Sequence, residues 1–529
     1  MAGKNIIICS DGTGNSAIKG RGTNVFKLFE AIDLNGHRYD PNRDPQVAFY
    51  DDGVGTERFK LLKIFAGATG WGLSRNVQQL YKEIVRIYDP GDRLFLFGFS
   101  RGAFTVRTLV GLIHTCGILD AKRFATADAL EAAVGRAYRL YRESYRTALA
   151  KLFLGEPDGS QITQLRKESC CEGDVDIAFL GVWDTVDGVG LPFHLSDFIN
   201  MTVYRFKFPD RKLSGCVGRA CHALAVDDER HSFHPLLWEA DPRIEQVWFA
   251  GAHSNVGGGY PKQGMSLVTL DWMMSEAEQA GLRLVGSDRE LYREHASVDD
   301  KLYNSRAGLG MFYRWKPRNI AAMCAEQGIA PKLHLSVIER IAHGTNDYTP
   351  GNLPPNPKVV FTRTGDPSWD ETLWQRTDEV EKVFLEAHRG GKPLLERARG
   401  AVVAGMVSYY LFLLTTLGAI FAASAPAGGG TVAEHLESAG TLLGRLATLR
   451  GGEVAASLGR LPESPWLITL AGGFLASWML AAAVDRRMSD VFSEFWHRQQ
   501  GSLRDALKRA RREAKALQAG PQRTGTGPR

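Results

Sequence analysis

Short apolar runs alternate with longer helical patterns over residues 5–260, and this alternation constrains the fold more than any other feature of the sequence. Several runs are apolar throughout instead of alternating with polar residues, as expected for strands buried on both faces of a sheet. We therefore predict an α/β fold with a mostly parallel sheet flanked by helices. The runs cover residues 6–10, 46–50, 93–99, 176–183 and 245–251, and the helical patterns lie near 71–88, 101–117 and 122–151.

Composition and charge exclude several classes of protein. The chain has 529 residues, of which 44% are hydrophobic and 23% are charged, which is ordinary for a globular protein. A net charge of +5 is small for this length, so no nucleic-acid partner is expected. Seven cysteines without metal-site spacing indicate a reduced, cytosolic compartment. The apolar run near the N-terminus is too short for a cleavable signal, and we expect none.

Each predicted strand ends in a loop of small, polar and catalytically capable residues. In parallel sheets, ligands bind beyond the carboxyl ends of the strands. The loops therefore predict one shared site. They read SDGTGN, YDDGVGT, GFSRGA, WDTVDGVG and GAHSNVGGGY.

Ser100 is the predicted nucleophile of this site. It follows the run at 93–99, precedes a helical pattern, and lies between Gly98 and Gly102. This order matches the strand, tight turn and helix that expose the nucleophile in α/β hydrolases. The pentapeptide alone is a weak signal, because a small serine in a structural turn would read the same way.

A serine hydroxyl needs a histidine base and a carboxylate that orients the histidine. In this fold the chain order is serine, acid, histidine. Asp184 directly follows the fourth run and His253 directly follows the fifth, so we predict a triad of Ser100, Asp184 and His253. The competing residues are His194, His222, His231 and His234 for the base, and Asp187, Asp227 and Asp228 for the acid.

Backbone N–H groups must stabilise the oxyanion of an acyl-transfer intermediate. We expect one from Arg101, which follows the nucleophile, and a second from Gly12 or Thr13 in the glycine-containing loop after the first run. The same loop lacks the lysine and spacing of a Walker motif and is not Gly-x-Gly-x-x-Gly, which argues against nucleotide binding.

Three carboxylates at the first two strand ends raise the question of a metal. Asp11, Asp51 and Asp52 could bind a divalent cation, but carboxylates at strand ends also accept hydrogen bonds from loop amides. No cofactor and no metal site is predicted, and the question stays open.

Residues 264–395 carry no recognisable motif. A helix is expected after Met265 and a loop near 354–358. This stretch either completes the domain or shapes access to the substrate. We place the catalytic domain at residues 1–395.

Two uniformly apolar segments follow, at residues 401–425 and 465–484. Each is long enough to cross a hydrocarbon core about 30 Å thick, and the alternative is a pair of buried soluble helices. The linker at 426–464 has a net charge of −1, whereas the tail at 485–529 has a net charge of +6. By the positive-inside rule we predict a transmembrane hairpin with the catalytic domain and the basic tail in the cytoplasm.

The loop motifs, together with the HALAVDDER stretch, resemble the α/β-hydrolase domain of the type VI secretion phospholipase effectors and their many uncharacterised bacterial relatives. The resemblance covers residues 4–275 and implies a triad that maps onto Ser100, Asp184 and His253. It also implies hydrolysis of phospholipid acyl esters, and a secretion or immunity partner if the chain is an effector. Asn255 departs from the family motif, which often has aspartate there.

The sequence thus predicts a membrane-anchored serine ester hydrolase, a lipase or phospholipase whose partners are the bilayer and a lipid or ester substrate. One alternative is a non-enzymatic membrane scaffold or regulator with a hydrolase-like domain. Another is a serine hydrolase acting on a thioester, a peptide or a soluble ester.

Overall fold

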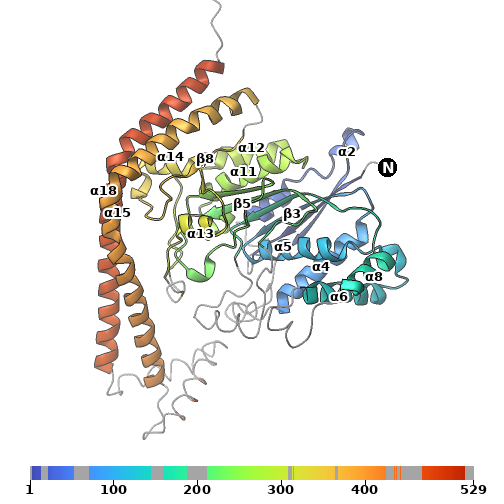
Figure 1. Ribbon diagram of the computed structural model, residues 1–529, viewed down its shortest axis with the longest axis horizontal. Coiled ribbons are helices and arrows are strands. Elements are labelled where there is room, and N and C mark those ends of the chain that lie inside the picture. Colours follow the sequence, from blue (N-terminus) through green and yellow to red (C-terminus); the bar gives the residue numbers. More distant parts are fainter. Residues whose placement is uncertain are drawn as a thin grey trace, which may run out of the picture.

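The computed structural model describes residues 3–12, 22–52, 71–144, 159–186, 211–307, 313, 315–363, 367–423 and 467–518, with isolated positions at 434, 437 and 441. The fold has two parts, an α/β body and a pair of long helices that runs along one side of it (Figure 1).

Among the described residues, one eight-stranded sheet forms the centre of the body, with its strand pairs all parallel, in the order β2-β1-β3-β4-β5-β6-β7-β8. Side chains of β1 and most of β3 are fully buried, which explains why these runs are apolar throughout. The strands are β1 (Asn5–Ser10), β2 (Gln46–Asp51), β3 (Arg93–Phe99), β4 (Asp176–Trp183), β5 (Val217–Ala225), β6 (Ile244–Phe249), β7 (Lys332–His334) and β8 (Lys358–Val360).

Helices cover both faces of the sheet (Figure 1). One face carries α4 (Trp71–Ile87), α5 (Arg101–Cys116), α6 (Ala127–Ser144) and α8 (Gly159–Ser169), and the other carries α1 (Asn24–Glu30) and α11 (Gly264–Gln279). Helix α5 packs directly on β3, because its apolar residues recur at helical spacing and are almost all buried. The predicted α/β fold with a parallel sheet and flanking helices is confirmed.

Described residues within 276–363 form part of the body. They contribute β7 and β8 at the edge of the sheet, together with α12 (Gly286–His295), α13 (Ile320–Glu326) and α14 (Leu335–His343). Helix α14 buries Val337, Ile338 and Ile341 against the helix pair. The two short strands carry too few residues for a period-2 pattern, so the sequence did not reveal them.

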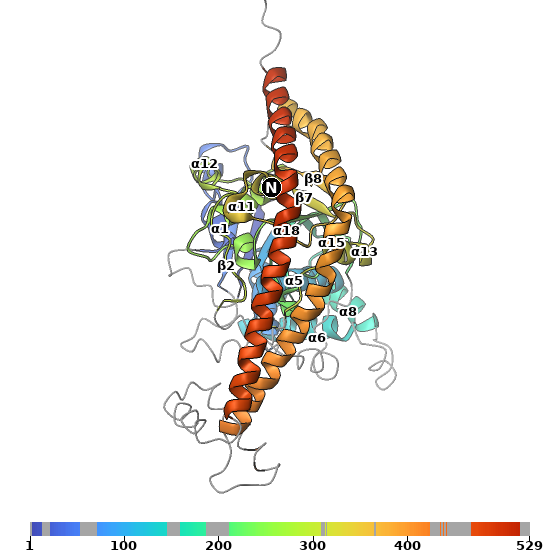
Figure 2. The ribbon, with the colours of Figure 1, turned by 90° about the vertical axis from the view of Figure 1, so that its left-hand side faces the viewer.

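The two long helices, α15 (Pro367–Ala423) and α18 (Leu467–Gln518), lie side by side over their length (Figures 1 and 2). Their Ala423 and Leu467 ends extend beyond the helices of the body in both views. Helix α15 runs without a break across residues 395–401, between the predicted catalytic domain and the first predicted span. The change in composition there is therefore not a break in the backbone, and the helix continues even past Gly390, Gly391 and Pro393.

Among the described residues, the stretch Ile468–Ala510 of α18 is the one helix long and apolar enough to cross a membrane. The apolar part of α15, Val403–Ala419, is shorter. The predicted linker at 426–464 lies almost wholly outside the described residues.

Candidate functional site

Ser100 lies on a sharp turn between β3 and α5, with backbone angles φ 58° and ψ −120°. A residue other than glycine rarely adopts a positive φ, and such strain is typical of a nucleophile elbow. The flanking glycines are required by close approach. A Cβ on Gly98 would lie 2.6 Å from the carbonyl oxygen of Gly102, and one on Gly102 would lie 2.1 Å from that of Ser10. The local sequence therefore dictates the turn.

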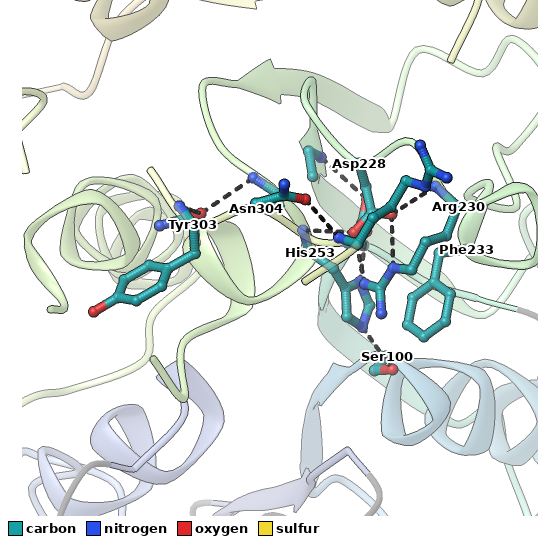
Figure 3. A network of polar contacts seen from close by, with 12 residues as sticks. Ser100, Asp228, Arg230, Phe233, His253, Tyr303 and Asn304 are labelled. Carbon is teal, nitrogen blue, oxygen red and sulfur yellow. Dashed lines mark hydrogen bonds and ion pairs between the residues drawn. The ribbon is translucent and has the colours of Figure 1, made fainter. Parts of the chain in front are cut away.

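The structure brings Ser100, Asp184 and His253 together from three strand ends. His253 Nε2 lies 2.8 Å from Ser100 Oγ, and His253 Nδ1 lies 2.6 Å from Asp184 Oδ2. Figure 3 shows the contact between His253 and Ser100, with the serine at the beginning of its helix. An ionised carboxylate can only accept, so Nδ1 of His253 donates to Asp184 and Nε2 is left to accept the serine proton.

Arg318 holds the carboxylate of this group, although no motif in the sequence marks it. Its Nη1 donates to Asp184 Oδ1 at 2.7 Å and its Nη2 donates to Asp184 Oδ2 at 2.8 Å, and both side chains are 0% exposed. The same guanidinium donates to the carbonyl oxygens of Ala225 and Phe233. Such a two-pronged contact is strong and fixes the plane of the carboxylate. Arg318 thereby positions the acid that contacts His253.

Burial and charge set the protonation states of this group. Burial raises the pKa of Asp184, but the Arg318 guanidinium and the hydrogen bond from His253 outweigh it and hold that pKa well below its usual range. Burial lowers the pKa of His253, against the opposing effect of Asp184. At neutral pH the carboxyl is therefore ionised and the imidazole neutral, which is the state in which Nε2 can take a proton.

Two aromatic rings enclose the imidazole of His253. The Phe99 ring centroid lies 4.6 Å away and that of Phe233 lies 5.0 Å away. A Cβ on Gly257 would lie 2.0 Å from the Phe99 ring, so this glycine of the GAHSNVGGGY loop makes room for the aromatic wall. The rings keep water from the histidine and restrict its orientation.

Asp228 holds the backbone of the histidine loop and not its ring. Its Oδ2 accepts the N–H of His253 at 3.2 Å, and both of its oxygens accept from Arg230, which also stacks over Phe233 (Figure 3). Asp227 accepts from the N–H of Gly251 and from a tyrosine hydroxyl. Asp184 is thus the one of these three carboxylates that contacts the ring, and Asp187 lies outside the described residues.

The competing histidines have other contacts. His222 Nε2 accepts the N–H of Thr185 at 3.0 Å, and burial lowers its pKa to about 3. His234 Nε2 lies 2.8 Å from the carbonyl oxygen of Lys316. His231 is in the same short 3-10 turn, and His194 lies outside the described residues.

The predicted oxyanion donors differ in their surroundings. The N–H of Arg101 opens helix α5 and has no acceptor within its own helix. The N–H of Gly12, by contrast, donates to Asp11 Oδ1 at 2.6 Å. Thr13 lies outside the described residues.

Asp11 organises the first loop through hydrogen bonds within the protein. Its Oδ2 accepts from Thr23 Oγ1 at 2.5 Å and from the Tyr50 hydroxyl at 2.7 Å. Asp51 accepts from the side chains of Ser10 and Asn76. Within the part of the chain that the structure describes, no group of three or more histidine, cysteine or acidic residues is placed to hold a metal ion.

Asn255, the departure from the family motif, ties the histidine helix to the segment at residues 300–304. Its Nδ2 donates to the carbonyl oxygen of Lys301 at 3.0 Å, and its Oδ1 accepts the N–H of Tyr303 at 3.2 Å. An amide can donate and accept at the same time, which a carboxylate cannot do. Asparagine thus provides a two-way contact to the backbone.

The sequence model described as "T6SS, Phospholipase effector Tle1-like, catalytic domain" matches residues 4–276. Residues of this chain are 27% identical over 265 positions to "Uncharacterized protein YEL023C" of Saccharomyces cerevisiae (strain ATCC 204508 / S288c), covering 47% of this chain and 34% of that protein. The chain therefore spans about a third of the length of this curated relative.

Two solved structures are also similar. One is the crystal structure of an uncharacterized protein from Pseudomonas aeruginosa, with a TM-score of 0.30, 18% identity, and coverage of 73% of this chain and 60% of the other. The second is the structure of the Tle1 effector bound to the VgrG spike from the Type 6 secretion system, with a TM-score of 0.27, 18% identity, and coverage of 49% and 52%.

Proposed function

Because the chain belongs to the family of Tle1-like phospholipase effector catalytic domains, we propose that it is a serine hydrolase that cleaves acyl esters of membrane lipids. The family by itself indicates lipase or esterase activity. The observation that carries the finer proposal is the chain of contacts from Ser100 Oγ through the His253 ring to Asp184, at 2.8 and 2.6 Å.

In the proposed reaction, Ser100 Oγ attacks the acyl carbonyl carbon while His253 Nε2 takes the hydroxyl proton. Asp184 holds the proton on Nδ1 and stabilises the imidazolium that forms. The carbonyl π-bond opens to an oxyanion, which accepts from the N–H of Arg101 and from the loop at residues 12–13.

Collapse of this intermediate expels the alcohol, which leaves with the proton from His253, and an acyl-serine remains. Water then hydrolyses the acyl-serine with the help of the same residues. His253 takes one of its protons, the hydroxyl attacks the acyl carbon, and Ser100 recovers its proton as the acid departs. The N–H of Gly12 takes part only after it turns from Asp11 toward the oxyanion, because Asp11 Oδ1 holds it at 2.6 Å.

Anchoring of this enzyme in a membrane is the second part of the proposal. Large apolar side chains are exposed on the parts of α15 and α18 that lie within the two predicted spans, including Leu414 (68%), Ile468 (85%) and Trp478 (63%). Water disfavours such a surface, whereas a bilayer accepts it. We place the helix pair in the bacterial inner membrane with the body and the basic tail in the cytoplasm, so that the site faces a bilayer substrate at high local concentration.

Labelling with a fluorophosphonate probe tests the serine chemistry. The full chain should react, Ser100→Ala should not, and Ser160→Ala, which changes an exposed serine in α8, should react like the parent. Absence of labelling in the parent, or equal labelling of Ser100→Ala, would favour a non-enzymatic scaffold.

Lipid analysis of cells that express the parent or Ser100→Ala tests the substrate. Loss of a phospholipid class with release of its fatty acid is expected for the parent alone. An unchanged lipid profile beside an active serine would point to a thioester or a soluble ester. For the anchor, reporters fused after Arg529 and near Gly429 should read cytoplasmic and external, respectively.

A further inference from the structure

A cavity of about 970 Å³ lies between the body and part of the helix pair, and the proposed reaction does not use it. We call it the junction cavity. Its wall includes residues of the 226–229, 301–306 and 345–352 segments on the body side, and residues from Gly405 to Phe412 of α15 and from Phe474 to Phe492 of α18 on the helix side. Ser100 and His253 do not line it.

The two walls of the junction cavity differ in polarity. Polar and charged side chains such as Lys301, Asn304 and Arg340 line the body side. Phe412 of α15 and Phe474 and Trp478 of α18 line the helix side. A ligand that satisfies both walls has a polar head and an apolar chain.

The cavity is also elongated along the helix pair. Its α18 residues run from Phe474 to Phe492, a length of about 27 Å at a rise of 1.5 Å per residue. The Phe474 end belongs to the predicted membrane span, whereas the Phe492 end packs against α14 of the body. The cavity therefore extends from the predicted membrane span to the body, which is the direction that an amphiphile in a leaflet would follow.

Arg340 indicates that the polar head of a ligand in the junction cavity is anionic. Its side chain is 1% exposed and lines the junction cavity. Its Nη1 donates to the carbonyl oxygens of Val298 and Asp300, its Nε is buried without a hydrogen-bond partner, and among the described residues it forms no ion pair with a carboxylate. The carboxylates of Asp227, Asp299 and Asp300 act on this guanidinium without a direct ion pair, and the Tyr348 ring centroid lies 5.2 Å from its Cζ. A carboxylate or phosphate would supply the direct, charge-assisted contact that a buried guanidinium favours.

Four other charged residues of the polar wall have partners. Arg318 is bound to Asp184, Asp228 is bound to Arg230, and Asp347 accepts from His497. Asp227 accepts a hydrogen bond from a tyrosine hydroxyl. Arg340 is therefore the buried cation that an incoming anion would meet, with the exposed Lys301 on the same wall.

We propose that the junction cavity binds an anionic amphiphile, with its carboxylate or phosphate head at Arg340 and its acyl chain along α15 and α18. Its wall includes Arg318, which holds Asp184, and Asp228, which holds the backbone of His253. In Figure 3, Asp228 and Asn304 lie on one side of His253 and Ser100 lies on the other. The ligand would thus contact the residues that support the triad without entering the site of acyl transfer.

The binding test uses the full Ser100→Ala chain in a neutral maltoside detergent, so that no ligand is hydrolysed. The thermal midpoint is measured against increasing oleate, dioleoyl phosphatidylglycerol, uncharged monoolein and inorganic phosphate. A saturable rise is expected with at least one of the two anionic amphiphiles, because a ligand that binds only the folded state stabilises it. Oleate alone would identify a free fatty acid, and phosphatidylglycerol a membrane lipid.

Variants separate this site from general detergent binding. In the Ser100→Ala background, Arg340→Gln should weaken binding by about tenfold or more, because charge-assisted hydrogen bonds are lost, and Arg340→Lys should restore part of it. Ala481→Trp should fill the cavity from α18 and abolish binding without touching Arg340, whereas Ala483→Trp, at an exposed position outside the cavity, should bind like the parent.

Equal shifts with monoolein and oleate would overturn the proposal, as would unchanged binding in Arg340→Gln or in Ala481→Trp. Because the serine is absent from these proteins, failure here leaves the proposed hydrolase untouched. Failure of fluorophosphonate labelling would in turn leave the cavity proposal untouched.

Discussion

The strand-end site and the helix pair differ in which side chains they bury and which they expose. At the strand ends, Ser100, Asp184 and His253 are buried. Hydrogen bonds join the serine hydroxyl to the imidazole and the imidazole to the carboxylate. Along the helix pair, large apolar side chains such as Leu414 are exposed, and a cavity lies between part of the pair and the body. The first region is organised for fixed geometry, and the second exposes the apolar surface on which the proposed membrane anchoring rests.

Substitutions in the triad should have the largest effect, because they remove the fixed geometry itself. Ser100→Ala should lower kcat/KM for an ester substrate by about 10⁶-fold, and Asp184→Asn by about 10⁴-fold, as expected when a nucleophile or the orientation of its base is lost. Steady-state kinetics with a fluorogenic phospholipid measures both. Retention of more than about a hundredth of the activity in Ser100→Ala would contradict the assignment.

Arg318→Met should have the next largest effect. It leaves Asp184 buried without its cation, which should cost about 3–5 kcal/mol of unfolding free energy. The pKa of Asp184 then rises, so the acid limb of the pH profile of kcat/KM should move to higher pH, and Arg318→Lys should restore part of the shift.

Arg289→Met is the matched control for this prediction. Arg289 is also a buried arginine, but it pairs with Asp271 on α11, away from the triad. It should lower stability and leave the acid limb in place. An unmoved acid limb in Arg318→Met would reduce Arg318 to a purely structural role.

Charges on the apolar helices test the second region. Leu414→Arg and Leu475→Arg change exposed residues that do not line the junction cavity, and each should cost about 2.5–3.5 kcal/mol of membrane insertion. The double variant should move the full chain from the carbonate-resistant to the soluble fraction, whereas Leu414→Ile with Leu475→Ile should not. A parent chain already soluble in carbonate would show that no hairpin is inserted.

A smaller effect is expected from buried histidines of the body. Burial lowers the pKa values of His222 and His334 from 6.5 to about 3, so the unfolded chain binds protons in this range that the folded chain does not. Stability is therefore fully present above pH 6.5 and falls as the pH drops toward 3, by about 1.4 kcal/mol per pH unit for each histidine.

His222→Gln should remove one histidine's share of that slope, since glutamine keeps an acceptor for the N–H of Thr185 and does not titrate. Urea unfolding of the full chain in detergent, followed by tryptophan fluorescence at pH 7.0 and 5.5, measures the difference. An unchanged slope would mean that His222 is not held neutral by burial.

The fold could be predicted largely from local pattern. The apolar runs at β3 and β4 coincide with the strands that form, and α5 begins at the residue after Ser100. The short strands β7 and β8 and the unbroken course of α15 were not predicted, because three-residue strands have no readable period and a change in composition need not end a helix.

The sequence alone determined which residues meet at the candidate site. Parallel strands carry their carboxyl ends to one edge, so Ser100, Asp184 and His253 had to come close once the strands were recognised. The same reasoning marked Arg101 and Gly12, although the bond from the N–H of Gly12 to Asp11 could not be foreseen.

Only the tertiary structure revealed Arg318 and the junction cavity. Arg318 follows His253 by 65 positions and reaches Asp184 through an irregular segment, which no periodicity describes. Composition likewise shows that the two long helices are apolar, but not which residues face the body or that Arg340 lies buried opposite them. Local pattern dictates strands and their ends because it acts between neighbours in the chain, whereas buried ion pairs and cavities arise from packing between distant segments.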